Sequence, residues 1–130
     1  MYSKNQIKTF IVMPCFNEED NLFESLSSLG FPNESTSLST DLNFVIVDNN
    51  STDSTYDIAN MLKDQYPENV HLIRESEQGY VPARHAGNLY VRNLATKKGW
   101  LIDEILILQV DADTLYSNDY ISAMRKASIF

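Results

Sequence analysis

The sequence predicts an α/β fold in which helices flank one parallel sheet, with strands and helices in the order βαβαβαβα. Short apolar runs rich in branched residues alternate along the chain with longer segments whose apolar residues recur every three or four positions. Turn-forming residues separate the two kinds of segment. No repeat, low-complexity tract or linker interrupts this alternation, so residues 1–130 are interpreted as a single domain.

Four apolar runs are expected to form the strands, because they are short and bounded by turn residues. Pro14 follows the first run, and it is expected to end that strand because a proline cannot donate to a sheet ladder. The fourth run carries no charge on either face, which favours a place in the middle of the sheet. The four runs are residues 7–13, 43–47, 70–73 and 105–110.

Four further segments carry apolar residues at helical spacing. The first ends at Gly30 and leads into a polar surface loop over residues 31–41. The third has Pro82 in its first turn, where a missing N–H costs least, and the fourth begins at about Ser117. The stripes expected to face the sheet are Leu22, Leu26 and Leu29; Ile58, Met61 and Leu62; Ala86, Leu89, Tyr90 and Leu94; and Ile121 and Met124.

The composition argues against several classes of protein. The formal net charge of −8 speaks against a nucleic-acid partner, which requires clustered lysine and arginine. The single cysteine, Cys15, excludes an internal disulfide and is expected to be a small core residue. No apolar run approaches the ~18 residues of a membrane span, and no signal peptide is evident. We therefore expect a cytoplasmic protein, attached to a membrane only through a longer parent chain.

Two carboxylates follow the fourth apolar run. Asp111 and Asp113 are expected at the C-terminal tip of that strand, where ligands bind in open α/β sheets. Carboxylate oxygens are preferred ligands of Mg²⁺ and Mn²⁺, and such an ion can bridge to phosphate oxygens. The Asp-x-Asp pattern alone is common, so the prediction depends on its place at the strand end.

Polar side chains also follow the first two strands, and parallel strands bring all these ends to one edge of the sheet. Two carboxylates about 4 Å apart repel by about 4 kcal/mol at an effective dielectric of 20, so gathering several on one edge needs a reason, and a divalent cation supplies one. A simpler interpretation is that residues 48–53 form a loop and a helix cap, and that acidic residues 18–20 complement a helix N-terminus. The side chains expected on this edge are Asn17, Glu18, Asp48, Asp53, Asp111 and Asp113.

Arg84 lies near the start of the third predicted helix. A cation there gains nothing from the helix dipole, so an anionic partner explains its position better, with a surface salt bridge as the alternative. The glycines fit neither a dinucleotide fingerprint nor a P-loop, so metal and Arg84 would hold phosphates in place of backbone amides. His71 is expected to be a surface residue of the third strand.

Four motifs, in this order, resemble the nucleotide-binding half of family 2 glycosyltransferases, which have the GT-A fold. They are residues 12–19 (VMPCFNEE), 45–53 (VIVDNNSTD), 79–88 (GYVPARHAGN) and 110–113 (VDAD). The resemblance covers nearly the whole chain and implies a Rossmann-like α/β sandwich of the GT-A type. It also implies an enzyme that transfers a sugar from a nucleoside diphosphate sugar to an acceptor hydroxyl, usually with inversion.

The same resemblance implies roles for individual residues. Asp48 or its neighbour would contact the base, and Asp111 would lie near the ribose and the metal. Asp113 would be the direct ligand of Mn²⁺ or Mg²⁺, with Asp111 beside it. The residues that the resemblance places on the nucleotide are Pro14, Asn17, Glu18, Asp48, Asn49, Arg84 and Asp111.

The sequence departs from the family pattern in two respects. The family often has a second aspartate where this chain has Asn49, and an amide presents different donors to a base edge. Inversion also requires a general base, which in the family lies well beyond the metal motif with the acceptor-binding half. We therefore expect the domain to be truncated at its C-terminus, with the base beyond Phe130 and little transfer by this chain alone.

Two other functions remain open from the sequence. One is a non-catalytic nucleotide-binding or assembly module, which would form a homo-oligomer through apolar surface exposed by the truncation. The other is a phosphatase of the haloacid dehalogenase type, in which Asp111 would attack phosphate and Asp113 would act as acid and base. That motif normally opens its domain, whereas almost nothing follows it here.

Overall fold

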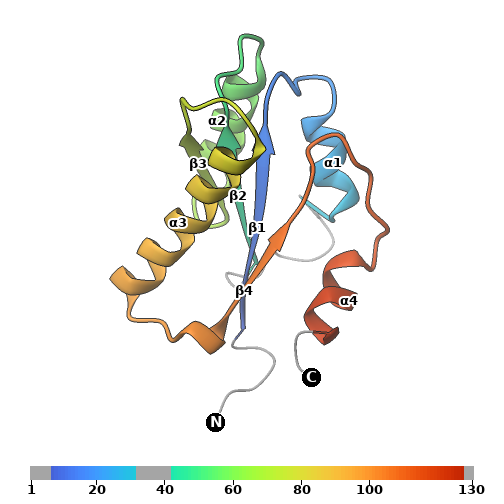
Figure 1. The fold of residues 1–130 in the computed structure, drawn as a ribbon. Helices are drawn as coiled ribbons and strands as arrows, with labels where there is room; N and C mark the ends of the chain where they lie inside the picture. The colour runs from blue at the N-terminus through green and yellow to red at the C-terminus, as the bar shows by residue number, and fades with distance from the viewer. Residues whose placement is uncertain (1–6, 32–41, 128–130) are drawn as a thin grey trace.

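The computed structural model describes residues 7–31 and 42–127, which form one parallel four-stranded sheet with helices on both faces (Figure 1). The strand order is β3-β2-β1-β4, so the direction of winding reverses between β1 and β4. A short 3₁₀ turn at Ile102–Glu104 precedes β4. The elements are β1 (Lys8–Cys15), α1 (Leu22–Ser28), β2 (Leu42–Asp48), α2 (Thr55–Gln65), β3 (Val70–Arg74), α3 (Tyr80–Lys98), β4 (Ile105–Gln109) and α4 (Tyr120–Ala127). The predicted fold class and element order are confirmed.

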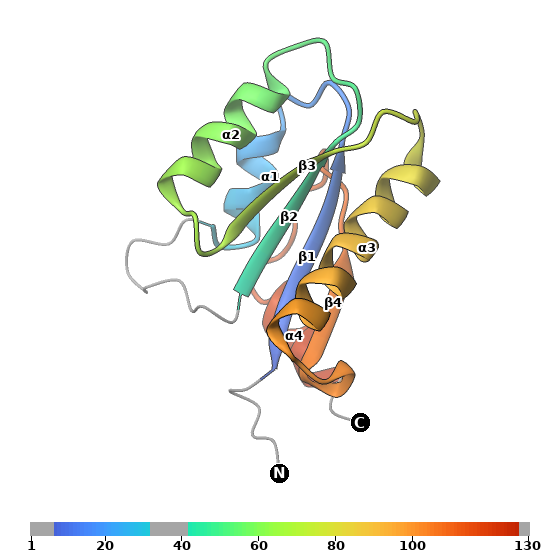
Figure 2. The ribbon, with the colours of Figure 1, turned by 90° about the vertical axis from the view of Figure 1, so that its left-hand side faces the viewer.

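Side chains alternate between the two faces of the sheet, as a strand's period of two requires. On β1, Ile11 and Met13 pack with α1, α2 and α4, whereas Phe10 and Val12 pack with α3 on the other face. Figure 2 shows α1 and α2 on one side of the strands and α3 on the other. Both faces of the central strands β1 and β2 are therefore buried, which explains why these strands are mostly apolar.

β1 does not end before Pro14 as expected, but continues through it to Cys15. Pro14 pairs with Val47 of β2, and Asn49 N donates to Cys15 O at 2.8 Å. Val110 N donates to Val12 O on the opposite side of β1, so Pro14, two residues further on, directs its nitrogen to that same side. The β1–β4 pairing has already ended at Val12, and a missing N–H at Pro14 costs the sheet nothing there.

β4 lies at the edge of the sheet formed by the described residues, which corrects its expected place in the middle. Ile105 and Ile107 are only partly buried, and Leu108 is the one strand residue that is fully buried. An apolar cavity of about 330 Å³ lies beside this edge, lined by residues of α3, β4 and the segment that joins them, including Trp100 and Ile102. Ile102 is 91% exposed, so apolar surface continues out to the solvent.

The buried stripe of α3 also differs from the expected one. Leu89 is exposed, whereas Ala86, Tyr90 and Leu94 pack against the core as expected, and the buried positions are the smaller Ala83, Gly87, Val91 and Ala95. A Cβ atom at Gly87 would lie 2.5 Å from Val12 Cγ1, which shows how closely the helix approaches β1. Small side chains therefore mark the inner face of this helix, and the larger ones flank it.

Smaller expectations have mixed outcomes. Met61 and Met124 are exposed, although Ile121 packs against the core as expected. Cys15 is buried, and burial raises the pKa of its thiol, as fits a core residue. The loop expected at 31–41 lies almost wholly outside the described residues. Within the described ranges, no helix combines the length and the apolar character that crossing a bilayer requires.

Candidate functional site

A cleft of about 210 Å³ opens at the C-terminal ends of β1 and β2. In open α/β sheets this is the edge where ligands bind, close to the point at which the strand order reverses. Predicted site residues Pro14, Glu18 and Asn49 contribute to its wall. The full lining is Pro14, Cys15, Phe16, Glu18, Asn49, Gln78, Gly79, Tyr80 and Ala112. The cleft is smaller than the roughly 300 Å³ at which pockets for drug-sized ligands begin, so it suits one part of a nucleotide.

Asp48 lies at the end of β2, paired with Cys15 of β1 and Arg74 of β3. Its side chain is only 3% exposed, and its Oδ1 atom has no hydrogen-bond partner within the part of the chain that the structure describes. A buried polar atom without a partner costs about 1–3 kcal/mol of folding free energy. Asp48 therefore carries an acceptor, next to the cleft residues Cys15 and Asn49, that the fold leaves unsatisfied.

Asn49 fastens the loop between β3 and α3. Its Nδ2 donates to Glu75 O and Glu77 O, both at 2.8 Å, and its Oδ1 accepts from Gly79 N at 2.9 Å and Gln78 Nε2 at 3.4 Å. Gly79 has φ +128, a conformation that favours glycine. All the hydrogen-bonding positions of this amide are thus filled by the protein, and Asn49 shapes the cleft by holding its wall.

Asn17 joins the loops that follow β1 and β2. Its backbone has φ +52, and its backbone N donates to Ser51 Oγ at 3.0 Å. Its side-chain Oδ1 accepts from Thr52 N at 2.8 Å and from Asp53 N at 3.3 Å. Glu18 N donates to Thr55 Oγ1 at 2.8 Å in the same junction. The two polar loops predicted to meet at the sheet edge therefore do meet, through the backbone N–H groups of Asn17 and Glu18 and the side-chain oxygen of Asn17.

Asp53 precedes α2 and binds the first backbone amide of the helix, whereas the N-cap residue itself, Ser54, makes no side-chain cap hydrogen bond. Asp53 Oδ1 accepts from Thr55 N at 2.9 Å, and its Oδ2 accepts from Glu19 N at 3.2 Å. Desolvation raises the pKa of Asp53, but the hydrogen bonds from Thr55 and Glu19 outweigh it and lower that pKa below its ordinary value. Asp53 is consequently a structural acid, whereas Asp48 retains a buried oxygen without a partner among the described residues.

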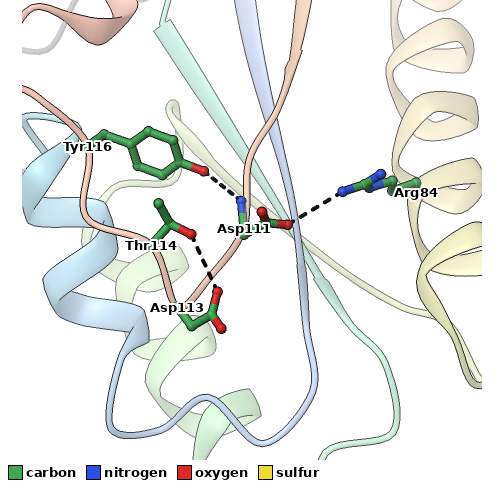
Figure 3. Close-up of polar contacts among 5 residues, drawn as sticks. All are labelled: Arg84, Asp111, Asp113, Thr114 and Tyr116. Atoms are coloured by element: carbon green, nitrogen blue, oxygen red, sulfur yellow. Dashed lines mark hydrogen bonds and ion pairs between the residues drawn. The ribbon is translucent and has the colours of Figure 1, made fainter.

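Arg84 and Asp111 point toward one another between α3 and the segment after β4 (Figure 3). Arg84 Nη2 lies 3.4 Å from Asp111 Oδ1, and both side chains are nearly half exposed. The guanidinium also lies 5.3 Å from the Tyr80 ring centroid. Arg84 Nε is buried and has no partner among the described residues. The salt bridge that the sequence left as an alternative is thus present, although it uses only part of the guanidinium.

The segment carrying the two aspartates is held by side chains from other elements. Tyr116 Oη accepts a hydrogen bond from Asp111 N at 2.8 Å (Figure 3), and Tyr116 N donates to Ser28 Oγ at 2.9 Å. Ser25 Oγ donates to Ala112 O at 2.5 Å from the same helix, α1. Asp113 is exposed, and its Oδ1 lies 3.5 Å from Thr114 Oγ1. Both carboxylates therefore sit on a fixed backbone with accessible oxygens.

The donor set at this segment fits a divalent metal of the Mg²⁺ type. The described residues contain no group of three or more histidine, cysteine or acidic side chains arranged to hold an ion. Mg²⁺ commonly binds through one or two carboxylates, with waters and substrate phosphates completing the shell. Asp111 and Asp113 supply two such carboxylates, and Asp111 would have to share its charge between the ion and Arg84.

Six lining residues were not among the predicted site residues: Cys15, Phe16, Gln78, Gly79, Tyr80 and Ala112. Phe16 is 49% exposed and Tyr80 is 63% exposed, so two aromatic rings stand at the opening of the cleft. Phe16 and Tyr80 lie within the motifs at residues 12–19 and 79–88, so an aromatic residue inside a motif was the available signal.

His71 is half-buried, which corrects its expected place on the strand surface. Its Nδ1 lies 2.7 Å from Tyr90 Oη, and its Nε2 lies 3.1 Å from Asn43 Oδ1. This cluster is on the α3 face, away from the cleft residues.

Comparisons with known proteins agree with this architecture. The model of the family described as glycosyl transferase family 2 matches residues 10–127. The structure of TarS residues 1–349 from S. aureus aligns over 92% of this chain and 32% of its own, with 22% identity and a TM-score of 0.56. The same TarS fragment in complex with UDP gives 91% and 31% coverage, 23% identity and a TM-score of 0.54.

The structure titled S. aureus TarS aligns over 91% of this chain and 19% of its own, with 23% identity and a TM-score of 0.56. At these identities the likeness shows the fold alone. The chain spans about a third of the length of the TarS fragment. No curated protein matches the chain significantly.

Proposed function

The chain belongs to glycosyl transferase family 2 and has the GT-A fold, and from this premise we propose that it binds a nucleoside diphosphate sugar for inverting transfer of the sugar to an acceptor hydroxyl. The observation that carries the proposal is the unsatisfied, buried oxygen of Asp48, which neighbours the cleft residues Cys15 and Asn49 without lining the cleft itself. A base edge offers N–H donors, and one of them would satisfy this acceptor. UDP is the ligand in one of the similar structures, and it carries such a donor.

The cleft offers the base a contact on its faces as well as on its edge. Phe16 and Tyr80 stand at the opening, and aromatic rings bind bases by stacking, worth about 1–3 kcal/mol per base. Asn49 contributes indirectly by holding Gln78 and Gly79 in the wall. In this arrangement Pro14, Glu18 and Asn49 shape the base pocket, Asn17 ties its two loops together, and Asp48 reads the base.

The diphosphate would lie between the start of α3 and the two aspartates. Asp113 and Asp111 would hold Mn²⁺ or Mg²⁺, which neutralises the diphosphate beside an acidic protein. Arg84 would supply the second positive charge, donating to phosphate oxygens through its half-exposed guanidinium. Each of these roles can be tested by substituting the residue concerned.

Calorimetric titration with UDP, GDP and dTDP, each with and without Mn²⁺, tests the proposed function. We expect one nucleotide to bind, and to bind at least tenfold more tightly with Mn²⁺. Asp113→Ala should remove the metal dependence but preserve weak metal-free binding. Asp103→Asn changes an exposed acid far from the cleft and serves as the matched control. Failure of all three nucleotides to bind would contradict the proposal, as would undiminished metal dependence in Asp113→Ala.

A non-catalytic assembly module is the second candidate, favoured by the exposed edge of β4 and the apolar cavity beside it. Edge strands and apolar patches of this kind bind other chains. Sedimentation over a range of protein concentrations separates the candidates: a discrete dimer that binds no nucleotide would favour the module. The phosphatase interpretation is disfavoured, because its motif opens a domain whereas here it follows β4 in a family 2 chain.

A further inference from the structure

Two polar contacts, one turn of α3 apart, connect this helix to β4 and to the segment that follows it. Arg84 Nη2 contacts Asp111 Oδ1 at 3.4 Å, and Gln109 Nε2 donates to Asn88 Oδ1 at 2.6 Å. Arg84 and Asn88 are four residues apart on the helix, so they share a face. Gln109 and Asp111 are two residues apart along the strand direction and likewise share a face. The two contacts therefore lie side by side, with Gln109 on the buried side of Asp111.

Each contact leaves one buried polar atom without a partner among the described residues. Gln109 Oε1 is an unsatisfied acceptor, and Arg84 Nε is an unsatisfied donor. Asn88 Oδ1 takes the amino group of Gln109, which turns Oε1 away from Asn88. The rest of this face is apolar, with Ile105 and Ile107 of β4 packed against α3.

Stability alone does not explain a glutamine here. Leaving a buried acceptor unpaired costs folding free energy, whereas an apolar side chain of similar volume would avoid that cost. The unpaired donor one helical turn away, Arg84 Nε, has the complementary chemistry to the acceptor Gln109 Oε1. The two atoms would satisfy one another if they met in another state of the site.

We propose that Gln109 is a positioning residue for Arg84: its Oε1 accepts a hydrogen bond from Arg84 Nε when the guanidinium leaves Asp111 and turns to the donor diphosphate. The inference rests on the proposed function, in which a metal ion recruits Asp111. Arg84 then loses its only described ion-pair partner and needs a new anchor. An arginine held at Nε directs its two Nη groups as a fork, which suits phosphate oxygens.

Asn88 has a supporting part in this arrangement. Its Oδ1 holds the carboxamide of Gln109 with the oxygen directed to the Arg84 side. Without Asn88 the carboxamide could rotate and present its amino group, which repels a guanidinium.

The test measures the affinity for UDP with Mn²⁺ and for uridine, because only UDP carries the diphosphate. Gln109→Met retains the length of the side chain and removes the acceptor. We expect it to weaken UDP binding about tenfold, the effect of one charge-assisted hydrogen bond, and to leave uridine binding unchanged. Gln109→Glu, which keeps an acceptor oxygen, should recover most of the loss. Asn88→Leu should produce a smaller loss that is again confined to UDP.

A double-mutant cycle shows whether Gln109 acts through Arg84. Arg84→Lys keeps the charge and removes Nε, so Gln109→Met should cost no further UDP affinity in that background. Equal weakening of UDP and uridine by Gln109→Met would overturn the inference, since it would indicate a structural role. So would the same tenfold loss in the Arg84→Lys background, or no loss in either. If the chain binds GDP in place of UDP, the same measurements are made with GDP and guanosine.

The outcomes separate this inference from the proposed function. UDP or GDP binding by the parent chain with no diphosphate-specific effect of Gln109→Met overturns the inference and leaves the proposed function standing. Absence of any nucleotide binding by the parent chain overturns both. Thermal unfolding of each variant shows whether a loss of affinity comes from unfolding. If Gln109→Met is unfolded, the affinities of Asn88→Leu for UDP and for uridine decide whether the inference holds.

Discussion

Arg84 Nη2 lies 3.4 Å from Asp111 Oδ1, and this contact joins the first turn of α3 to the acidic segment after β4. Both partners are nearly half exposed, so the pair contributes little to stability, about 0–1 kcal/mol for a solvent-exposed ion pair. The contact instead brings the Arg84 guanidinium and the Asp111 carboxylate, a candidate metal ligand, together at the mouth of the site. In the proposed complex the two would separate, with Asp111 on the ion and Arg84 on the phosphates.

Asp111→Asn is therefore expected to affect ligand binding and spare the fold. The amide is a poorer metal ligand, so metal-dependent nucleotide affinity should fall at least about tenfold, which corresponds to 1.4 kcal/mol. The free energy of unfolding should change by less than about 1 kcal/mol. Calorimetry and urea unfolding measure the two quantities, with Asp103→Asn as control. A large loss of stability with no loss of affinity would assign the ion pair to the scaffold.

Asp48→Asn should separate binding from stability in a different way. Because Oδ1 of Asp48 is buried without a described partner, the change removes no hydrogen bond to that atom. We expect the free energy of unfolding to stay within about 1 kcal/mol of the parent value or to rise, as at sites kept for function. Nucleotide affinity should fall, because the replacement amide is uncharged and puts an NH₂ donor in place of one of the two acceptor oxygens. Unfolding in urea and titration with UDP test both, and a loss of several kcal/mol would mean that Asp48 is structural.

The sequence predicted which strand ends carry the polar residues, because apolar runs that stop at Asp48 and Asp111 are local patterns. It did not predict which of those side chains are already satisfied. Asn17 and Asn49 bond to groups 26 to 36 residues away, and no local pattern reports such partners. The position of β4 was wrong for a similar reason: an apolar run reports burial, but the order of strands is decided by packing across the chain.

The saturated amide of Asn49 leads to a prediction that opposes the family pattern. Asn49→Asp restores the aspartate often found there, but it removes both donors to Glu75 O and Glu77 O. We expect it to cost about 2–4 kcal/mol, because two carbonyls lose partners and face a carboxylate. Asn93→Asp is the matched control, since Asn93 is exposed on α3 and its change should cost less than about 1 kcal/mol. Urea unfolding of both variants decides the point, and equal costs would contradict the proposed loop-fastening role.

Gly87 tests the close approach of α3 to the sheet. An added Cβ would lie 2.5 Å from Val12 Cγ1 and 3.2 Å from Val47 Cγ2, and both valines are fully buried. Gly87→Ala should therefore destabilise the protein by about 1–3 kcal/mol, the usual cost of overpacking, despite the better helix propensity of alanine. Val12→Ala should be less harmful in the Gly87→Ala background than in the parent. Additive costs in the double variant would show that the helix moves away instead.

His71 makes stability depend on pH. Its Nε2 lies 3.1 Å from Asn43 Oδ1, which can only accept, so Nε2 carries the proton and Nδ1 accepts from Tyr90 Oη at 2.7 Å. This neutral ring is fully bonded, and burial lowers the pKa of His71 below its ordinary value of 6.5. Between the lowered and the ordinary pKa, the unfolded chain binds more protons than the folded one.

The contribution of His71 is therefore fully present above pH 6.5 and is lost as the pH falls through that value toward the lowered pKa. Urea unfolding between about pH 8 and pH 5.5 should show the parent losing stability over this interval, above the range in which most carboxylates titrate. His71→Gln keeps a polar side chain but does not titrate, so its stability should change less with pH. Parallel curves for the two proteins would mean that His71 is protonated equally in both states, and a parent that gains stability on acidification would reverse the sign of the argument.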